Sequence, residues 1–161
     1  MQILLVGCSG FVGRELVPLL LGQGHHLSLL SRQARPLATI ADPALERLQG
    51  DPSQAATWQQ PELLAALAGA EAVINLAGEP IAEKRWTAAQ RQLLFDSRVA
   101  TTGHLVAALG ALAAQPRQPR PSVLIHGSAI GFYGTSLSER FGEASPAGSD
   151  LLGRLCAAWE A

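Results

Sequence analysis

The chain has 161 residues, of which 48% are hydrophobic and 16% charged, so it can form one domain with a sizeable core. Its net charge is −1 and it has no basic block, so neither nucleic acid nor an anionic membrane is expected as a partner. With no cationic leader and no apolar run long enough to span a bilayer, we expect a soluble cytoplasmic protein.

The first predicted elements are a strand and a helix. The continuous apolar run Ile3–Val6 is typical of a strand covered on both faces, as in a parallel sheet. Apolar residues then recur at helical spacing over Val12–Leu20, and Gly22 marks the end of this helix. Pro18 lies inside the predicted helix, where proline usually produces a kink, but the apolar periodicity continues across it.

Three glycines between this strand and helix indicate a nucleotide-binding turn. Gly7 permits a tight turn, Gly10 lets a diphosphate approach the backbone, and Gly13 lets the helix pack close to the strand. Free amide N–H groups and the helix dipole at the helix start attract phosphate charge. The G-x-x-G-x-x-G spacing is looser than G-x-G-x-x-G, but strand, turn, helix and second strand follow in the required order. We therefore predict a dinucleotide site.

A second apolar run, Leu27–Leu30, ends at Ser31 and Arg32, where a dinucleotide site selects its cofactor. Sites for NAD usually place Asp or Glu here to bind the ribose 2′-hydroxyl, and this chain has no acid at that position. Ser31 can donate a hydrogen bond, Arg32 can pair with a 2′-phosphate, and Arg35 is a candidate second cation. The pattern favours NADP over NAD. The alternative is that Arg32 is a solvated loop residue.

The rest of the chain continues the alternation of strands and helices. Strands are predicted at 47–51, 71–76 and 123–126, helices at 61–68, 87–112 and from 151 onward after a Ser149-Asp150 cap, and a proline-rich loop at 115–121. This order predicts an α/β, doubly wound parallel sheet, the Rossmann fold. We expect residues 1–161 to be the NAD(P)-binding domain of something longer, with later strands and a substrate domain missing.

Three motifs together resemble the extended short-chain dehydrogenase/reductase superfamily: residues 7–13, 75–78 and 128–134. Four segments are similar to its atypical subgroup of NAD-dependent epimerase/dehydratase-like proteins, whose full chains carry a small C-terminal domain: residues 78–81, 84–87, 97–99 and 156–160. The resemblance covers nearly all of the chain. It implies a Rossmann-fold, NAD(P)-binding oxidoreductase or epimerase that acts on an unknown small-molecule substrate.

The resemblance also implies where the cofactor binds. Five residues of the glycine turn are expected to line the diphosphate: Gly7, Ser9, Gly10, Phe11 and Val12. Arg32 is expected at the adenosine ribose and Asp51 near the adenine amino group. Three residues after the fourth strand are expected along the adenosine: Leu76, Ala77 and Gly78. The 75–78 segment can also be a turn that stabilises the sheet.

Ser128 and Tyr133 are the candidate catalytic residues. Ser128 follows the fifth strand, at the carboxyl edge where open α/β sheets bind ligands. The resemblance implies that Ser128 hydrogen-bonds the substrate oxygen that gains or loses a proton, and that Tyr133 shapes the substrate pocket. The alternative for Ser128 is that it only caps a turn.

The chain departs from the superfamily at the Tyr-x-x-x-Lys pair, which supplies an acid/base and the cation that lowers its pKa. With Glu160 matched to a glutamate four residues after that lysine, the pair falls on Leu152 and Cys156. Leucine has no proton to give and a neutral thiol supplies no cation. The chain is therefore either an NADP-dependent oxidoreductase or epimerase with a different acid/base, or a non-catalytic NADP-binding sensor or scaffold.

Several side chains are candidate replacements for the missing pair. Tyr133 can act as the acid/base if a cation lies close, and the candidates are Lys84, Arg85 and Arg98. His126 can relay protons, although a histidine at a strand end is more often a hydrogen-bonded core residue. The cysteines are distant, without a C-x-x-C pattern, which indicates a reducing compartment, no metal site and two unreactive thiols. Missing flanking strands would expose a sheet edge, so we also expect a homo-oligomer.

Overall fold

The computed structural model describes residues 1–115 and 121–161. These residues divide into two compact units, an N-terminal unit of Met1–His126 and a C-terminal unit of Gly127–Ala161. Most of the proline-rich segment predicted at 115–121 lies outside the described residues.

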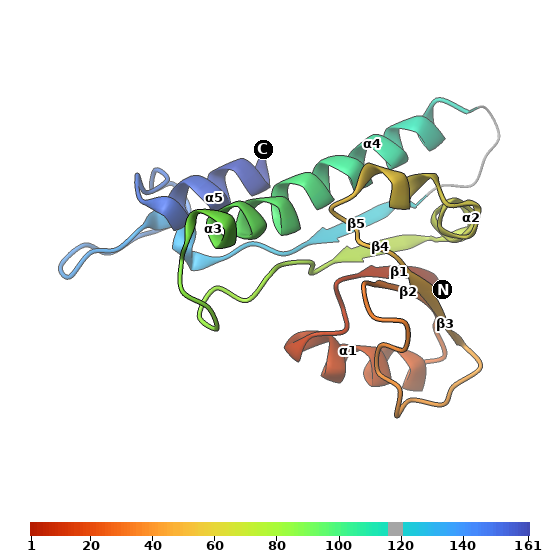
Figure 1. Cartoon of the computed structure of the whole chain (residues 1–161). Coiled ribbons are helices and arrows are strands. Elements are labelled where there is room, and N and C mark those ends of the chain that lie inside the picture. Colours follow the sequence, from red (N-terminus) through yellow and green to blue (C-terminus); the bar gives the residue numbers. More distant parts are fainter. Residues whose placement is uncertain (116–120) are drawn as a thin grey trace. The chain divides into compact units, whose positions relative to one another are not determined.

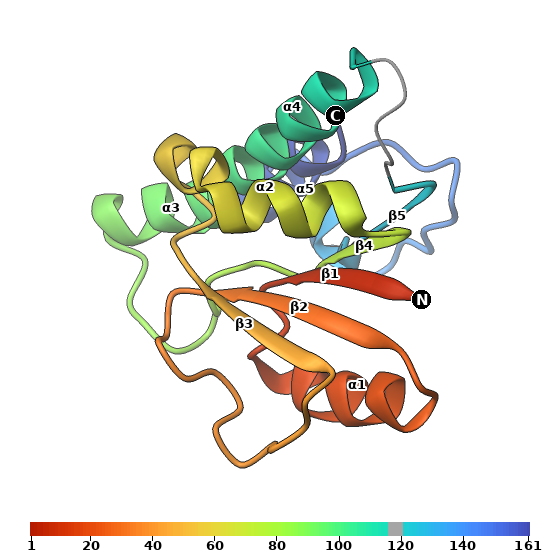
Figure 2. The same cartoon turned by 90° about the vertical axis from the view of Figure 1, so that its right-hand side faces the viewer.

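The N-terminal unit contains one five-stranded parallel sheet of order β3-β2-β1-β4-β5 (Figures 1 and 2). The strands are β1 (Gln2–Val6), β2 (His26–Ser31), β3 (Leu45–Gln49), β4 (Ala72–Asn75) and β5 (Val123–His126). This order confirms the predicted doubly wound fold, because β1 lies at the centre and the chain adds strands outward on both sides. The third strand begins and ends two residues earlier than predicted.

The helices are α1 (Phe11–Gly22), α2 (Pro61–Gly69), α3 (Ala88–Phe95), α4 (Thr101–Ala113) and α5 (Leu151–Glu160). Pro18 lies within α1 as predicted, and the Asp150 side chain accepts a hydrogen bond from the Gly153 N–H at the start of α5. The single helix predicted at 87–112 is instead α3 and α4 joined by a π-helical segment, Asp96–Ala100. Short 3₁₀ turns occur at Ala55–Gln59 and Ile130–Tyr133.

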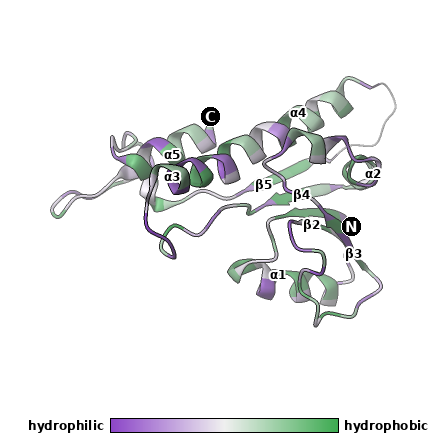
Figure 3. Ribbon diagram, viewed as in Figure 1, coloured by the Kyte–Doolittle hydropathy of each residue, from purple (hydrophilic) through white to green (hydrophobic). Residues whose placement is uncertain are grey.

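The helices of the N-terminal unit cover both faces of the sheet, with α1 on one side and α2 and α4 on the other (Figure 2). Because successive side chains of a strand point to opposite faces, Leu4 and Val6 pack in the cluster under α2 and α4, while Ile3 and Leu5 pack under α1. Figure 3 shows this apolar character along the strands. The double burial explains why the sequence of β1 is a continuous apolar run rather than an alternating one.

Strand β5 forms one edge of the sheet and exposes apolar side chains. Among the described strands it pairs with β4 alone, and Val123, Leu124 and Ile125 are 45%, 41% and 51% exposed. An edge of this kind presents unpaired backbone N–H and C=O groups beside apolar surface, which favours pairing with another chain.

We therefore expect the chain to self-associate through β5, and Ile125→Lys to shift it toward a monomer, because a charged side chain at the edge opposes strand pairing. Light scattering over a range of protein concentrations measures the molar mass of the particles in solution. Leu19→Lys is the control, since Leu19 is also exposed but lies on α1. A monomer mass for the unmodified chain at every concentration would contradict the expectation.

Candidate functional site

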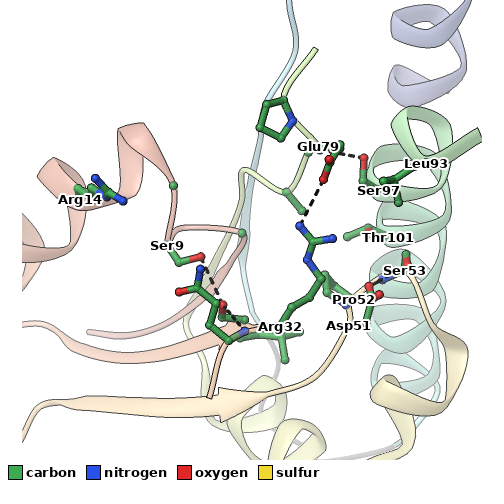
Figure 4. Close-up of a pocket in the computed structure, with 18 residues that line it drawn as sticks. Ser9, Arg14, Arg32, Asp51, Pro52, Ser53, Glu79, Leu93, Ser97 and Thr101 are labelled. Carbon is green, nitrogen blue, oxygen red and sulfur yellow. Dashed lines mark hydrogen bonds and ion pairs between the residues drawn. The ribbon is translucent and has the colours of Figure 1, made fainter. Parts of the chain in front are cut away.

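A cavity of about 300 Å³ lies in the N-terminal unit at the carboxyl ends of β1, β2, β3 and β4 (Figure 4). Eight of the residues predicted to bind a dinucleotide line it: Gly7, Ser9, Gly10, Ser31, Arg32, Asp51, Ala77 and Gly78. The residues come from four separate strand ends, and the parallel sheet brings them to one edge. Arg35, the candidate second cation, is not among the residues that line this cavity.

Four other predicted residues do not line the cavity. Phe11 and Val12 begin α1 with exposed side chains, so what they offer a ligand there is the backbone N–H groups of a helix start. Gly13 packs against the turn that follows β1, because an added Cβ would overlap the carbonyl group of Cys8. Leu76 donates its N–H to the Val6 carbonyl and packs with the apolar cluster under α1.

The ends of β1, β2 and β4 are held together by close backbone approach and by hydroxyl groups. Gly7 has φ +74°, and a Cβ there would overlap the backbone of Ala77, so only glycine fits without a shift. The Ser9 and Ser31 hydroxyl oxygens are 3.3 Å apart, and Ser31 Oγ also accepts the Gln33 N–H at 3.2 Å. The glycine turn and the end of β2 therefore form one connected structure.

The Glu79 carboxylate pairs with two cations at the cavity. The sequence prediction gave this residue no role. Arg32 Nη2 lies 3.4 Å from Glu79 Oε2, and Lys84 Nζ donates to Oε1 at 2.7 Å. Glu79 is 4% exposed. Lys84, through its hydrogen bond and charge, holds the pKa of Glu79 below its usual range although burial acts in the opposite direction. The buried side chain is therefore a carboxylate at neutral pH.

The backbone of Glu79 is held by the π-helical segment. Its N–H donates to Ser97 Oγ at 2.9 Å, and its carbonyl accepts Arg98 Nη1 at 3.0 Å. Ser97 also lines the cavity, and its hydroxyl donates to the Leu94 carbonyl. Further lining residues that sequence reasoning missed are Arg14, Leu30, Gln33, Pro52, Ser53, Pro80, Leu93 and Thr101.

Asp51 lies just after β3 rather than within it. Its Oδ1 accepts the Ser53 N–H at 3.0 Å and the Ser53 hydroxyl at 2.8 Å, which closes a turn at the cavity wall. One oxygen of this carboxylate is therefore occupied by the turn.

The long loop that follows Arg32 is held by hydrogen bonds from β3. Arg47 of β3 donates hydrogen bonds to the carbonyl groups of Pro36, Leu37 and Ile40, at 2.9, 3.1 and 2.6 Å. Leu37 has φ +52°, a conformation that is uncommon outside glycine. A single guanidinium thus fixes the course of the loop between β2 and β3.

His126 and Asn75 lie at neighbouring strand ends. His126 Nδ1 is 3.3 Å from Asn75 Nδ2, which also donates to Thr102 Oγ1 at 3.2 Å, and Asn75 Oδ1 accepts the Ala77 N–H at 3.1 Å. These bonds support the interpretation of His126 as a hydrogen-bonded structural residue and of 75–78 as a turn that stabilises the sheet.

In the C-terminal unit, Ser128 and Tyr133 line a second hollow of about 400 Å³ together with Glu143 and Glu160. The Ser128 hydroxyl donates a hydrogen bond to the Glu160 carboxylate. The Tyr133 ring stacks on Phe141, with centroids 5.5 Å apart. The structure thus brings the two candidate catalytic residues to one hollow and places the Glu160 carboxylate next to Ser128.

The positions matched to the missing acid/base pair lie beside the loop that carries Tyr133. A Cβ on Gly131 would be 3.4 Å from Leu152 Cβ and 3.8 Å from Cys156 Sγ. Both cysteines are buried, and burial raises the pKa of Cys8 to about 12, so that thiol stays protonated and unreactive at neutral pH. Of the three candidate cations for Tyr133, Lys84 binds the Glu79 carboxylate and Arg98 binds the Glu79 carbonyl.

No helix in the described ranges is long and apolar enough to cross a membrane. In residues 1–115 and 121–161, no group of three or more His, Cys, Asp or Glu side chains is arranged to hold a metal ion.

Comparison with known structures finds the same fold in solved proteins. Human epimerase family protein SDR39U1 (isoform 2) with NADPH superposes with a TM-score of 0.71 at 29% identity, covering 99% of this chain and 48% of that chain. A UDP-galactose 4-epimerase superposes with a TM-score of 0.75 at 19% identity, which shows the fold alone.

Comparison with curated proteins gives the family. The chain is 32% identical over 160 residues to the chloroplastic SDR39U1 homolog of Arabidopsis thaliana, and 34% identical over 161 residues to the epimerase family protein YfhF of Bacillus subtilis. Both alignments include 99% of this chain but only 43% and 48% of the relatives, so the chain spans less than half the length of each relative. The model of the NAD dependent epimerase/dehydratase family matches residues 3–150. The chain belongs to the NAD dependent epimerase/dehydratase family.

Proposed function

We propose that the chain binds a dinucleotide in the cavity at the carboxyl ends of its strands, and that it prefers NADP to NAD. The observation that carries the preference is the end of β2, where Ser31 and Arg32 line the cavity and no acid stands at the position that binds the ribose 2′-hydroxyl in NAD sites. A relative whose structure contains NADPH is 29% identical to this chain over the aligned residues, which supports the proposal.

The cavity offers a separate group for each part of such a cofactor. The N–H groups at the start of α1 would bind the diphosphate beside Gly10, where an added Cβ would meet nothing nearer than the Gly7 carbonyl oxygen at 4.0 Å. The guanidinium of Arg32 would pair with the 2′-phosphate, and the second carboxylate oxygen of Asp51 would accept a hydrogen bond from the adenine amino group.

Calorimetric titration of NADPH and of NADH into the 161-residue chain tests this proposal. We expect NADPH to bind about tenfold more tightly, the value of one charged hydrogen bond at a partly exposed site. Equal affinities would contradict the NADP preference, and the absence of binding by either would contradict a dinucleotide site.

For the reaction, we propose an oxidoreductase or epimerase of the short-chain dehydrogenase type acting on a small molecule. Tyr133 would hydrogen-bond the substrate oxygen, and Ser128 would accept a hydrogen bond from the substrate hydroxyl while its own hydroxyl donates to Glu160. The proton that leaves the substrate would pass to Ser128 as the Ser128 proton passes to the Glu160 carboxylate. A non-catalytic, NADP-responsive sensor is the second candidate, because Leu152 and Cys156 supply neither an acid nor a cation.

Turnover separates these two candidates. The measurements are the change in NADPH absorbance with carbonyl substrates and the formation of an epimer, followed by NMR, with sugar-nucleotide substrates, because epimerisation leaves the cofactor unchanged overall. Both are made for the wild type, Ser128→Ala and Tyr133→Phe. Turnover that survives both substitutions would remove these residues from catalysis, and NADPH that binds without either NADPH oxidation or epimer formation would favour the sensor.

A further inference from the structure

Glu79 lies between two cations that come from different parts of the chain. One carboxylate oxygen faces Arg32 at the end of β2, at 3.4 Å, and the other faces Lys84 of the loop before α3, at 2.7 Å. The Glu79 side chain is 6% exposed, whereas those of Arg32 and Lys84 are 56% and 57% exposed. Figure 4 shows the Arg32 guanidinium directed at this carboxylate.

The backbone of Glu79 is fixed at the cavity, because both of its polar groups are bound by the π-helical segment. Ser97 accepts its N–H, and Arg98 donates to its carbonyl. A half-exposed arginine otherwise loses rotamer freedom when it binds a ligand, and this loss weakens binding. A guanidinium already held by Glu79 avoids part of that loss.

An acid at this place also creates a difficulty, which Lys84 removes. An unneutralised carboxylate next to Arg32 would repel the phosphate that Arg32 is proposed to bind. Lys84 neutralises it from the opposite oxygen, and Lys84 is not among the residues that line the cavity. Two cations and one carboxylate leave the cluster of Arg32, Glu79 and Lys84 with a net charge of +1.

We propose that Glu79 is a positioning residue that orients Arg32 toward a ribose 2′-phosphate, and that Lys84 contributes to the same selectivity only by neutralising Glu79. The inference rests on the proposed NADP preference and extends it from one residue to three. The ligand chemistry is a phosphate monoester on the adenosine ribose.

The test compares adenosine 2′,5′-bisphosphate with adenosine 5′-monophosphate, which differ only in the 2′-phosphate. Their ratio of dissociation constants is measured for the wild type, Glu79→Gln, Lys84→Met and the double variant. We expect each single substitution to reduce selectivity for the bisphosphate by about fivefold, and the double variant to lose no more than Glu79→Gln alone, because coupled residues are not additive. The bisphosphate carries more negative charge than the monophosphate, so a change in overall charge also alters the ratio, and a control variant that loses one cation measures that part.

Arg85→Met is the matched control, since Arg85 is the next cation in the same loop, is exposed and does not line the cavity. It is expected to leave the ratio within about twofold, as for an isolated surface charge. If Glu79→Gln does not fold, the comparison of Lys84→Met with Arg85→Met decides, and an unchanged ratio in both overturns the proposal.

The other outcomes separate this inference from the proposed function. An equal further loss from Lys84→Met in the Glu79→Gln background means that Lys84 contacts the phosphate directly, which overturns the neutralising role. Selectivity that is retained in Glu79→Gln but lost in Arg32→Ala overturns the inference alone. A wild type that does not distinguish the two nucleotides overturns both proposals.

Discussion

Arg32→Ala is expected to weaken NADPH binding about tenfold while NADH binding stays within about twofold. A hydrogen bond to a charged group contributes about 1.5–3 kcal/mol. We expect the lower end, since Arg32 is 56% exposed and water screens its charge. Because NADH lacks the 2′-phosphate, it cannot report this loss, and the ratio of the two dissociation constants measures the effect.

The neighbouring Arg35 is the control for this substitution. It is exposed, lies three residues further along the same loop and does not line the cavity, so Arg35→Ala should leave the ratio unchanged. A loss of NADPH selectivity in Arg35→Ala but not in Arg32→Ala would contradict the prediction, because it would mean that Arg35 binds the 2′-phosphate.

Gly13→Ala is expected to lower the free energy of unfolding by about 3 kcal/mol, the upper end for overpacking a close contact. The added Cβ would overlap the backbone of Cys8, which lies between β1 and α1 and cannot rotate away as a side chain would. The start of the helix and the turn must then move apart. Urea denaturation followed by circular dichroism measures the change.

Two other glycines of the same region provide matched comparisons. Gly22→Ala lies at the end of α1 with nothing within 4 Å of the added Cβ, so stability should be unchanged or rise by about 0.5–1 kcal/mol. Gly10→Ala is also free of close contacts, so it should fold normally yet weaken dinucleotide binding by blocking the diphosphate. Equal stability losses in Gly10→Ala and Gly13→Ala would contradict this division of roles.

The fold could be predicted from the sequence because its elements have strong local patterns. The double burial of β1 produces its uninterrupted apolar run, and the glycine turn shows where the first helix begins. The junction between α3 and α4 was missed because a π-helical segment keeps helical apolar spacing and contains no Gly or Pro to mark it.

The cavity was only partly predictable, because some of the residues that meet there are far apart in the sequence. Ser31, Arg32 and Gly7 belong to a local pattern whose spacing is readable. Glu79 meets Arg32 across 47 residues, and nothing in the sequence around either side chain specifies that contact. Glu79 lies in the 78–81 segment that carries part of the family resemblance, but the resemblance assigned its side chain no contact.

The anchoring of the β2–β3 loop by Arg47 has a consequence for engineering cofactor preference. The loop that follows Arg32 has its conformation set by a guanidinium that lies outside it, on β3. A graft that exchanges only the loop for one from an NAD-using protein would bring new carbonyl positions to an unchanged arginine. The transferable cassette is therefore the loop together with β3, and a swap should include both.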